Sequence, residues 1–294
     1  MADRPFDDRD GYIWMDGDFV AWRDTKVHVL THAMHYASCV FEGERAYGGK
    51  IFESLRHSQR LANSAEIMGF DLPVSVAELE DIKAETLAKS GLESAYIRAF
   101  AWRGSEMMGV SAQTNTIHLA VAVWAWGDYF ADKMKGIRMT HAQWRRPAPD
   151  TAPCHAKAAG LYMICTLSKH TAEQAGYADA LMLDYRGQVA EATGANVFFL
   201  RDGALHTPTP DCFLNGITRQ TAIKLAKSRQ IEIIERAILP EELPTFSECF
   251  ITGSAAEITP VSEIGDVTYT PGAVSEALVS DYSDLVHGRI TVNA

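Results

Sequence analysis

Four short segments rich in small residues occur in order along the second half of this 294-residue sequence. Residues 151–160 carry Lys157, residues 191–196 carry Glu191, residues 214–219 read Leu-Asn-Gly-Ile-Thr-Arg, and residues 253–260 begin with Gly-Ser-Ala-Ala. Glycine lets a ligand or another stretch of backbone approach closely. We therefore expect the fold to present a lysine, a carboxylate, a helix start and a turn of backbone amides to one ligand.

Lys157 is the candidate catalytic residue. A lysine amine whose pKa lies near neutrality is a good nucleophile toward a carbonyl carbon, and it can carry protons afterwards. Most lysines are exposed, but Ala156 and Ala158 flank this one with little bulk. Glu191, which Asn196 can orient, supplies a carboxylate of the kind that keeps a pyridine nitrogen protonated. The order of lysine, carboxylate, helix start and turn predicts a pyridoxal phosphate site.

Three features are suited to hold anionic groups. Gly216, Ile217 and Thr218 begin a predicted helix, whose first amides are unpaired and whose dipole favours an anion. The turn at residues 253–257 exposes amide N–H groups. Arg60, on the first predicted helix, can grip a phosphate with two parallel hydrogen bonds. Taken singly, each feature is also typical of an ordinary helix start, a tight turn or a solvated charge.

Two predicted strands offer side chains to a pocket. Tyr96 and Arg98 alternate along one strand, so they share a face and can both reach into a cavity. Phe41 and Gly43 place an aromatic ring and a bare backbone where a pocket wall is narrow. The alternative for Phe41 is ordinary core packing, the usual role of an aromatic residue on a strand.

Charge and composition exclude several classes of function. A net charge of −11 is unlike the basic surface of a nucleic-acid-binding protein. The polar N-terminus is unlike a signal peptide, and the apolar stretch 117–126 is too short to span a bilayer. Five cysteines form no C-x-x-C pair, which indicates a reducing compartment. We expect a cytoplasmic protein with small-molecule partners, no nucleic acid, no membrane and no metal.

The first 126 residues are predicted to form a small α+β unit. A hairpin is expected around Asp16-Gly17, because glycine accepts the positive φ of a tight turn. Apolar residues at helical spacing predict helices over 55–68 and 76–87, with Gly91 as a stop. Strands are expected at 27–30, 96–102 and 116–126, and β-prone residues run through 35–43.

A more polar stretch separates this unit from the rest of the chain. We place an interdomain linker at 127–137 and a larger, cofactor-binding C-terminal domain at 138–294. Helices are predicted over 158–174 and 217–227, and a hairpin at Asp202-Gly203. Short strands are predicted at 137–143, 180–184, 188–190, 197–200, 231–235 and 248–252. Many short strands with added helices indicate a two-domain α+β fold, and no G-x-G-x-x-G supports a dinucleotide fold.

From about residue 12 to residue 261, the sequence resembles the branched-chain amino acid aminotransferases, pyridoxal phosphate enzymes of fold type IV. The resemblance rests on motifs in a characteristic order: 40–43 (Val-Phe-Glu-Gly), 59–61 (Gln-Arg-Leu), 95–98 (Ala-Tyr-Ile-Arg), 156–158 (Ala-Lys-Ala), Tyr162, 187–196, 216–219 (Gly-Ile-Thr-Arg) and 255–261 (Ala-Ala-Glu-Ile-Thr-Pro-Val). It implies pyridoxal 5'-phosphate as cofactor. It also implies the α+β, two-domain fold of the D-amino acid aminotransferase-like enzymes.

The resemblance assigns roles to individual residues. Lys157 would be the Schiff-base lysine and proton shuttle, and Tyr162 would meet the phenolic oxygen of the cofactor. Glu191, beside Asn196, would meet its pyridine nitrogen. The phosphate would be held by Arg60, Gly216, Ile217, Thr218 and Ser254, and Leu214 would pack on the ring. The substrate would contact Tyr36, Phe41, Gly43, Tyr96, Val110, Trp126, Tyr129, Ser254, Ala255 and Ala256, with Arg98 accepting the distal carboxylate of glutamate.

The implied reaction is a ping-pong transamination. Leucine, isoleucine or valine would donate its amine, and 2-oxoglutarate would accept it to give L-glutamate. In this family Tyr36 and the Gly109-Val110 loop come from the neighbouring subunit, which implies at least a homodimer, with a hexamer as the larger alternative. Alternatives on the same fold are D-amino acid or (R)-amine transamination and aminodeoxychorismate cleavage. A non-catalytic domain that binds an anionic metabolite, with a structural Lys157, is the alternative of another class.

Overall fold

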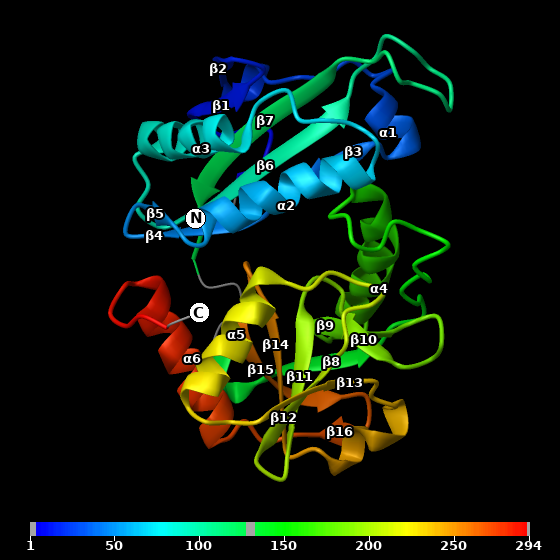
Figure 1. Cartoon of the computed structure of the whole chain (residues 1–294), viewed down its shortest axis with the longest axis vertical. Coiled ribbons are helices and arrows are strands. Elements are labelled where there is room, and N and C mark those ends of the chain that lie inside the picture. Colours follow the sequence, from blue (N-terminus) through cyan, green and yellow to red (C-terminus); the bar gives the residue numbers. More distant parts are fainter. Residues whose placement is uncertain (1–3, 128–132, 293–294) are drawn as a thin grey trace. The chain divides into compact units, whose positions relative to one another are not determined.

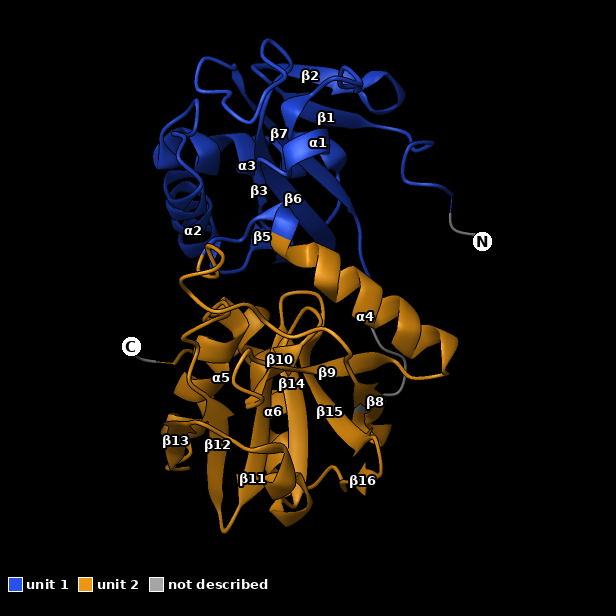
Figure 2. Cartoon of the chain, turned by 90° about the vertical axis from the view of Figure 1, so that its right-hand side faces the viewer, with its two compact units in different colours: residues 1–127, 156–160 blue, residues 128–155, 161–294 orange. Residues whose placement is uncertain are grey.

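The computed structural model describes residues 4–127 and 133–292, which form two compact units (Figure 2). Unit 1 comprises residues 1–127 and 156–160, and unit 2 comprises residues 128–155 and 161–294. The sequence predicts a linker at 127–137 followed by an uninterrupted domain at 138–294. In the structure the short segment that carries Lys157 belongs to unit 1, so the predicted C-terminal domain is interrupted at residues 156–160. No helix among the described residues is long and apolar enough to cross a membrane.

Unit 1 is an antiparallel sheet with helices (Figure 1). Its strands are β1 (Tyr12–Met15), β2 (Asp18–Ala21), β3 (Cys39–Phe41), β4 (Glu44–Tyr47), β5 (Lys50–Ile51), β6 (Ala95–Arg103) and β7 (Ile117–Ala125). Its helices are η1 (Trp22–Asp24), α1 (His32–Tyr36), α2 (Ser54–Ile67) and α3 (Val76–Ser90). The strand order is β2-β1-β7-β6-β4-β5, with β3 paired to β6. Helices α2 and α3 pack on each other and on the sheet, around a core that includes Leu61, Leu79 and Ile97.

Local sequence explains several elements of unit 1. Asp16 (φ 51°) and Gly17 (φ 108°) take positive φ between β1 and β2, which confirms the predicted hairpin. Ser75 and Glu78 form a capping box at the start of α3, and Gly91 (φ 67°) ends that helix in the left-handed conformation. The strands predicted at 96–102 and 116–126 are confirmed as β6 and β7.

The strand predicted at 27–30 is wrong. These residues form no strand, and Val29 is 70% exposed. β-prone residues form a strand only where a neighbouring strand pairs with them, and no described strand pairs here. The β-prone stretch 35–43 is also divided, because α1 ends at Tyr36 and Ala37 takes a φ of 54° before β3 begins.

Unit 2 is built on a second, larger sheet (Figure 1). Its strands are β8 (Ile137–His141), β9 (Asp179–Leu183), β10 (Val189–Ala192), β11 (Asn196–Arg201), β12 (Ala204–Pro208), β13 (Ile233–Arg236), β14 (Glu248–Gly253), β15 (Glu257–Ile264) and β16 (Val267–Thr268). The helices are η2 (Lys133–Lys135), α4 (Met163–Gln174), α5 (Ile217–Ser228), η4 (Pro240–Thr245) and α6 (Ala273–Val286), and η3 (Ala159–Tyr162) runs from unit 1 into unit 2. The strand order is β10-β9-β8-β15-β14-β11-β12-β13, with β16 on β15.

The sheet of unit 2 closes on itself. Strand β10 pairs with both β9 and β11, so β10-β9-β8-β15-β14-β11 form a closed ring. Apolar side chains that include Val197, Phe199 and Ile251 form the core, and α5 and α6 pack on each other and on β14 and β15. The β10–β11 pairing sets Glu191 directly opposite Asn196. Ring closure therefore places a carboxylate and an amide side by side.

Several elements of unit 2 differ from expectation, among them α4, β15 and α6. The helix predicted over 158–174 begins only at Met163, because Ala158 forms a bridge with Val40 of β3 and η3 intervenes. Strand β15 was not predicted, and Pro260 within it argues against a strand when pairing partners are unknown. Helix α6 was also not predicted. Its first amides are capped by Glu248, a residue distant in sequence, whose carboxylate accepts from Ser275 N at 2.8 Å.

Candidate functional site

The backbone of Lys157 is held from two sides within unit 1. Its N–H donates to Ser64 Oγ on α2 at 3.0 Å, and its carbonyl accepts from the N–H of Phe41 at 3.1 Å. The neighbouring Val40–Ala158 bridge continues this short antiparallel contact. The small residues beside Lys157 are needed because Ala156 and Ala158 are buried in the core of the unit. Two hydrogen bonds thus fix the backbone from which the lysine side chain extends.

The amine of Lys157 is enclosed by protein. The residue keeps some exposed surface, but its Nζ lies 4.9 Å from the ring centre of Phe41. Burial lowers the pKa of Lys157 to about 8, and the charges of Arg60 and Arg98 act in the same direction, against Glu42 and Tyr96. A larger fraction of this amine than of an ordinary lysine amine is therefore unprotonated near neutral pH, which favours its reaction with a carbonyl.

Tyr96 and Arg98 meet on the predicted face of β6. Arg98 Nη2 donates to Tyr96 Oη at 3.2 Å, and the guanidinium lies 4.7 Å from the ring centre of Phe41. A side chain at Gly43 would overlap Tyr96 Oη, which explains the glycine. Arg98 Nε is buried and has no hydrogen-bond partner among residues 4–127 and 133–292. A cation with an unsatisfied donor is suited to bind a carboxylate.

Arg60 lies on α2 and pairs with Glu42, a residue to which the sequence assigns no role. Its Nε and Nη2 donate to the two carboxylate oxygens of Glu42 at 2.6 and 2.8 Å. Glu42 also lies 2.7 Å from Nδ1 of His57. The sequence motif contains this glutamate between Phe41 and Gly43, but only the packing of α2 shows what it contacts.

In unit 2 the carboxylate of Glu191 is held by two partners. Arg146 Nε lies 3.2 Å from one oxygen, and Asn196 Nδ2 donates to the other at 3.1 Å. Arg146 is almost fully buried; burial lowers its pKa, but Glu191 together with the nearby Cys165 and Tyr162 more than offsets burial, so its pKa is raised. Arg146 was not predicted, because its segment reads only as a polar loop with prolines. The contact of Asn196 with Glu191 agrees with the orienting role that the sequence predicts for Asn196.

Asn196 also connects this carboxylate to the start of α5. Its Oδ1 accepts from Gly216 N at 3.1 Å, and its Nδ2 donates to the carbonyl of Leu214 at 3.0 Å. A side chain at Gly216 would overlap Asn196 Oδ1. Gly216 is the N-cap of α5 and provides no side-chain cap, so the amides of Ile217 and Thr218 keep the anion-binding character of a helix start.

The remaining predicted residues fall at separate places. Trp126 lies beside Tyr96 with tilted rings whose centres are 4.9 Å apart, and Tyr162 precedes α4. Ser254, Ala255 and Ala256 form the turn between β14 and β15. Tyr36 packs on His32, whose Nε2 lies 2.8 Å from the carbonyl of Gly109. No described contact joins Tyr36 or Val110 to Lys157. Tyr129 lies outside the described residues.

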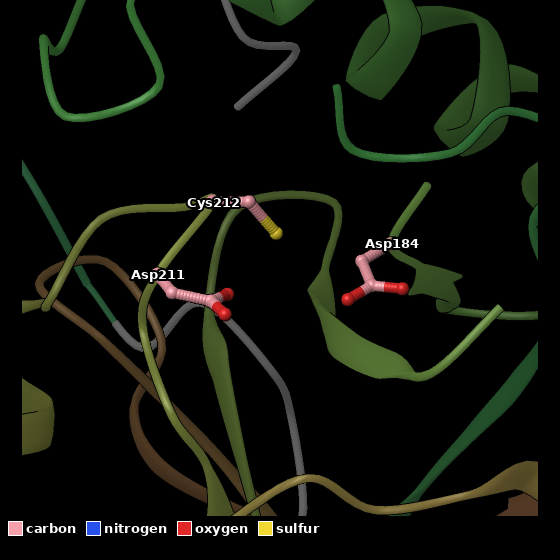
Figure 3. A group of neighbouring side chains, drawn as sticks. All are labelled: Asp184, Asp211 and Cys212. Carbon is pink, nitrogen blue, oxygen red and sulfur yellow. The ribbon is translucent and has the colours of Figure 1, made fainter. Parts of the chain in front are cut away.

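Asp184, Asp211 and Cys212 form an acidic group with one ligand atom of each within 4.8 Å of the others (Figure 3). Arg186 Nη2 lies 2.6 Å from Asp184 and 2.8 Å from Asp211. Burial and the neighbouring Asp211 raise the pKa of Cys212 to about 12, so its thiol is neutral. The Arg186 guanidinium pairs with both carboxylates, which makes the group an ion-pair cluster within unit 2.

Residues 39–264 match the profile of the family Amino-transferase class IV. The chain belongs to this family. A branched-chain-amino-acid aminotransferase from Pseudomonas aeruginosa is 39% identical over 296 residues, which cover 98% of this chain and 96% of that protein. These matches confirm the resemblance identified from the motifs.

Solved structures of this family confirm the predicted fold class. The branched-chain amino acid aminotransferase of Escherichia coli has a TM-score of 0.92 at 36% identity, covering 96% of this chain and 97% of that one. The T.th. enzyme of the same name, complexed with N-(5'-phosphopyridoxyl)-L-glutamate, has a TM-score of 0.92 at 37% identity, covering 96% of each chain. Both similarities extend over nearly the whole chain.

Pyridoxal phosphate is the cofactor of class IV aminotransferases, and the residues of each unit fit it. Unit 1 offers the amine of Lys157 with its lowered pKa. Unit 2 offers the Glu191 carboxylate, fixed by Arg146 and Asn196, and a helix start left open at Gly216. These groups match an aldehyde, a pyridine nitrogen and a phosphate respectively.

Gly216→Ala tests the link between Asn196 and the helix start. The new methyl group must displace the Asn196 amide. We therefore expect the affinity for the cofactor to fall by about tenfold, which corresponds to the loss of one or two hydrogen bonds. The measurement is the dissociation constant of pyridoxal phosphate by equilibrium dialysis. Gly194→Ala is the matched control, because its added methyl meets nothing within 4 Å. Equal losses in the two variants would contradict the assigned role of Gly216.

The amine of Lys157 should titrate far below an ordinary lysine. In the cofactor-free protein we expect its acetylation by acetic anhydride to rise with pH around a midpoint near 8, because only the neutral amine reacts. Mass spectrometry of the Lys157 peptide gives the profile, with exposed-lysine peptides as the internal reference. Arg60→Ala should move the midpoint upward, since removing a nearby positive charge favours the ammonium. A midpoint at the reference value would contradict the enclosed amine.

Proposed function

We propose that this chain is a pyridoxal phosphate-dependent branched-chain-amino-acid aminotransferase that uses 2-oxoglutarate as amine acceptor. The main observation behind this proposal is Lys157, whose backbone N–H is held by Ser64 and whose amine has a lowered pKa, in a chain that belongs to the class IV family. Relatives named branched-chain-amino-acid aminotransferase, similar over nearly the full length, support the substrate class. A related structure with 4-methylvaleric acid, which has a branched apolar chain, gives further support.

The cofactor, when bound, supplies an electron sink that weakens the bond between the substrate Cα and its hydrogen. Lys157 would hold the cofactor, and its Nζ would take up and return the proton of the substrate Cα. Glu191 keeps the pyridine nitrogen protonated, with Arg146 and Asn196 orienting its carboxylate, and Tyr162 contacts the phenolic oxygen. The groups that bind the phosphate are the Arg60 guanidinium, the α5 amides at Gly216, Ile217 and Thr218, and Ser254, while Leu214 packs on the ring.

One substrate site must accept both an apolar side chain and the distal carboxylate of glutamate. Phe41, Trp126 and Tyr129 supply apolar surface, and Arg98 supplies the cation for the carboxylate. The surroundings of Arg98 suit both kinds of side chain. Its guanidinium lies over the Phe41 ring and donates a hydrogen bond to Tyr96, while its Nε has no hydrogen-bond partner among the described residues. Tyr96 and the amides at Ser254, Ala255 and Ala256 position the α-carboxylate, with Gly43 leaving room for Tyr96.

The protein acts as at least a homodimer, in which Tyr36 of the partner subunit and Val110 of the partner subunit complete the substrate site. Support comes from exposure within a single chain, where Tyr36 is 44% and Val110 is 86% exposed. His32 joins the two segments, since it stacks on Tyr36 and lies 2.8 Å from the carbonyl of Gly109. Sedimentation velocity of the purified protein measures the oligomeric state.

The visible absorbance of the cofactor-loaded protein tests the proposed reaction. We expect L-leucine to remove the cofactor band and 2-oxoglutarate to restore it, because the two half-reactions are separable in a ping-pong mechanism. Lys157→Ala should abolish both changes. A band that ignores L-leucine but responds to a D-amino acid or (R)-amine would assign the protein to those transaminases. Release of pyruvate from aminodeoxychorismate without an amine acceptor would indicate a lyase. Absence of any cofactor absorbance band would indicate a non-catalytic domain.

Arg98→Ala tests the dual-substrate site. We expect the specificity constant of the glutamate half-reaction to fall by about tenfold or more, because a charge-assisted contact is lost, while that for leucine changes by less than about threefold. Single-turnover absorbance changes measure each half-reaction separately. Arg98→Lys keeps the charge without the planar guanidinium, so its specificity constant for glutamate should lie between those of the wild type and of Arg98→Ala. Equal losses for both substrates in Arg98→Ala would exclude the assigned role.

A further inference from the structure

Glu42 is a fully buried carboxylate directly behind the residues that face Lys157. Phe41 lies 4.9 Å from the Lys157 amine, and a side chain at Gly43 would overlap Tyr96, so these two neighbours share a side of the chain. Successive residues of an extended segment point to opposite sides. Glu42 accordingly points away from Lys157's side and contacts α2 instead.

Helix α2 supplies the two side chains, Arg60 and His57, that contact this carboxylate. Oε1 accepts from Arg60 Nε at 2.6 Å, while Oε2 accepts from Arg60 Nη2 at 2.8 Å and lies 2.7 Å from His57 Nδ1. The backbone N–H of Gly43 donates to the same Oε2 at 3.3 Å. His57 and Arg60 are three residues apart and so project from one face of the helix. One carboxylate therefore engages a complete edge of the Arg60 guanidinium.

The charge state of Glu42 makes this contact strong. Burial raises its pKa, but the charges and hydrogen bonds of Arg60 and His57 more than offset burial and hold the pKa well below its usual range. The pair with Arg60 is thus charge-assisted and bidentate, the geometry that fixes the plane of a guanidinium. An arginine side chain otherwise has many rotamers, whose loss opposes ligand binding.

We propose that Glu42 is a positioning residue that holds the Arg60 guanidinium in the orientation in which it binds the cofactor phosphate. Glu42 itself does not touch cofactor or substrate. This inference rests on the phosphate-binding role of Arg60 in the proposed function. Its consequence is specific, because a residue that acts through a phosphate contact affects only ligands that carry the phosphate.

Glu42→Gln separates this role from a merely structural one. The variant keeps the side-chain shape but loses the charge, so we expect its affinity for pyridoxal phosphate to fall by about tenfold or more, as for the loss of charged hydrogen bonds. Affinity for pyridoxal, which lacks the phosphate, should change by less than about twofold. Both dissociation constants are measured by equilibrium dialysis of the full-length protein. Equal losses for the two ligands would overturn the proposal.

A double-mutant cycle shows whether Glu42 acts through Arg60. In an Arg60→Ala background, Glu42→Gln should weaken pyridoxal phosphate binding by less than about twofold, because the residue it positions is already absent. A full additional loss would overturn the proposal. If Arg60→Ala alone weakens both ligands equally, the phosphate role of Arg60 in the proposed function fails, an outcome distinct from failure of Glu42→Gln.

Glu44→Gln is the matched control. Glu44 is an equally buried carboxylate two residues away, but it pairs with Lys83 at 2.8 Å, and Lys83 retains Glu80 at 2.8 Å. We expect this variant to leave the ratio of the two affinities unchanged. If Glu42→Gln fails to fold, as judged by thermal unfolding, Glu42→Asp keeps the charge while shortening the reach. The same phosphate-specific loss is expected, and its absence would overturn the proposal.

Discussion

The fixed backbone of Lys157 is the constraint on which the rest of the arrangement depends. Ser64 and Phe41 hold its N–H and carbonyl, so the segment around it belongs to unit 1 although the flanking chain belongs to unit 2. An enclosed amine is costly to charge, and Arg60 and Arg98 increase that cost. The resulting lowered pKa favours the neutral, nucleophilic form of the side chain.

The second arrangement is the network around Asn196 in unit 2. One amide group contacts the Glu191 carboxylate, the Leu214 carbonyl and the Gly216 N–H. A carboxylate and a helix start that are distant in sequence are thereby held in one relation. The closed ring of strands makes this possible, because β10 and β11 pair at the Glu191–Asn196 position. Fixed hydrogen-bonding groups cost no reorganisation when a ligand arrives.

Much of this could be predicted from local pattern. The hairpin at Asp16-Gly17, the limits of α3 and the alternation that brings Tyr96 and Arg98 together follow from turn chemistry, capping and strand periodicity. The prediction of a strand at 27–30 is wrong because strand formation depends on a neighbouring strand that pairs with it. The predicted helix start at Ala158 is wrong for a related reason. The Val40–Ala158 bridge uses a residue that helical spacing alone would assign to the helix.

The sequence by itself determined the family and the cofactor, and it predicts Lys157 as the reactive lysine, because these depend on residue types in a characteristic order. Only the tertiary structure decided which residues support them. Arg146 beside Glu191, and Glu42 beneath Arg60, give no local signal, since a charged residue in a loop or strand pairs with whatever the packing brings within reach. Charge pairing acts through space over a few ångströms, and the sequence records only separation along the chain.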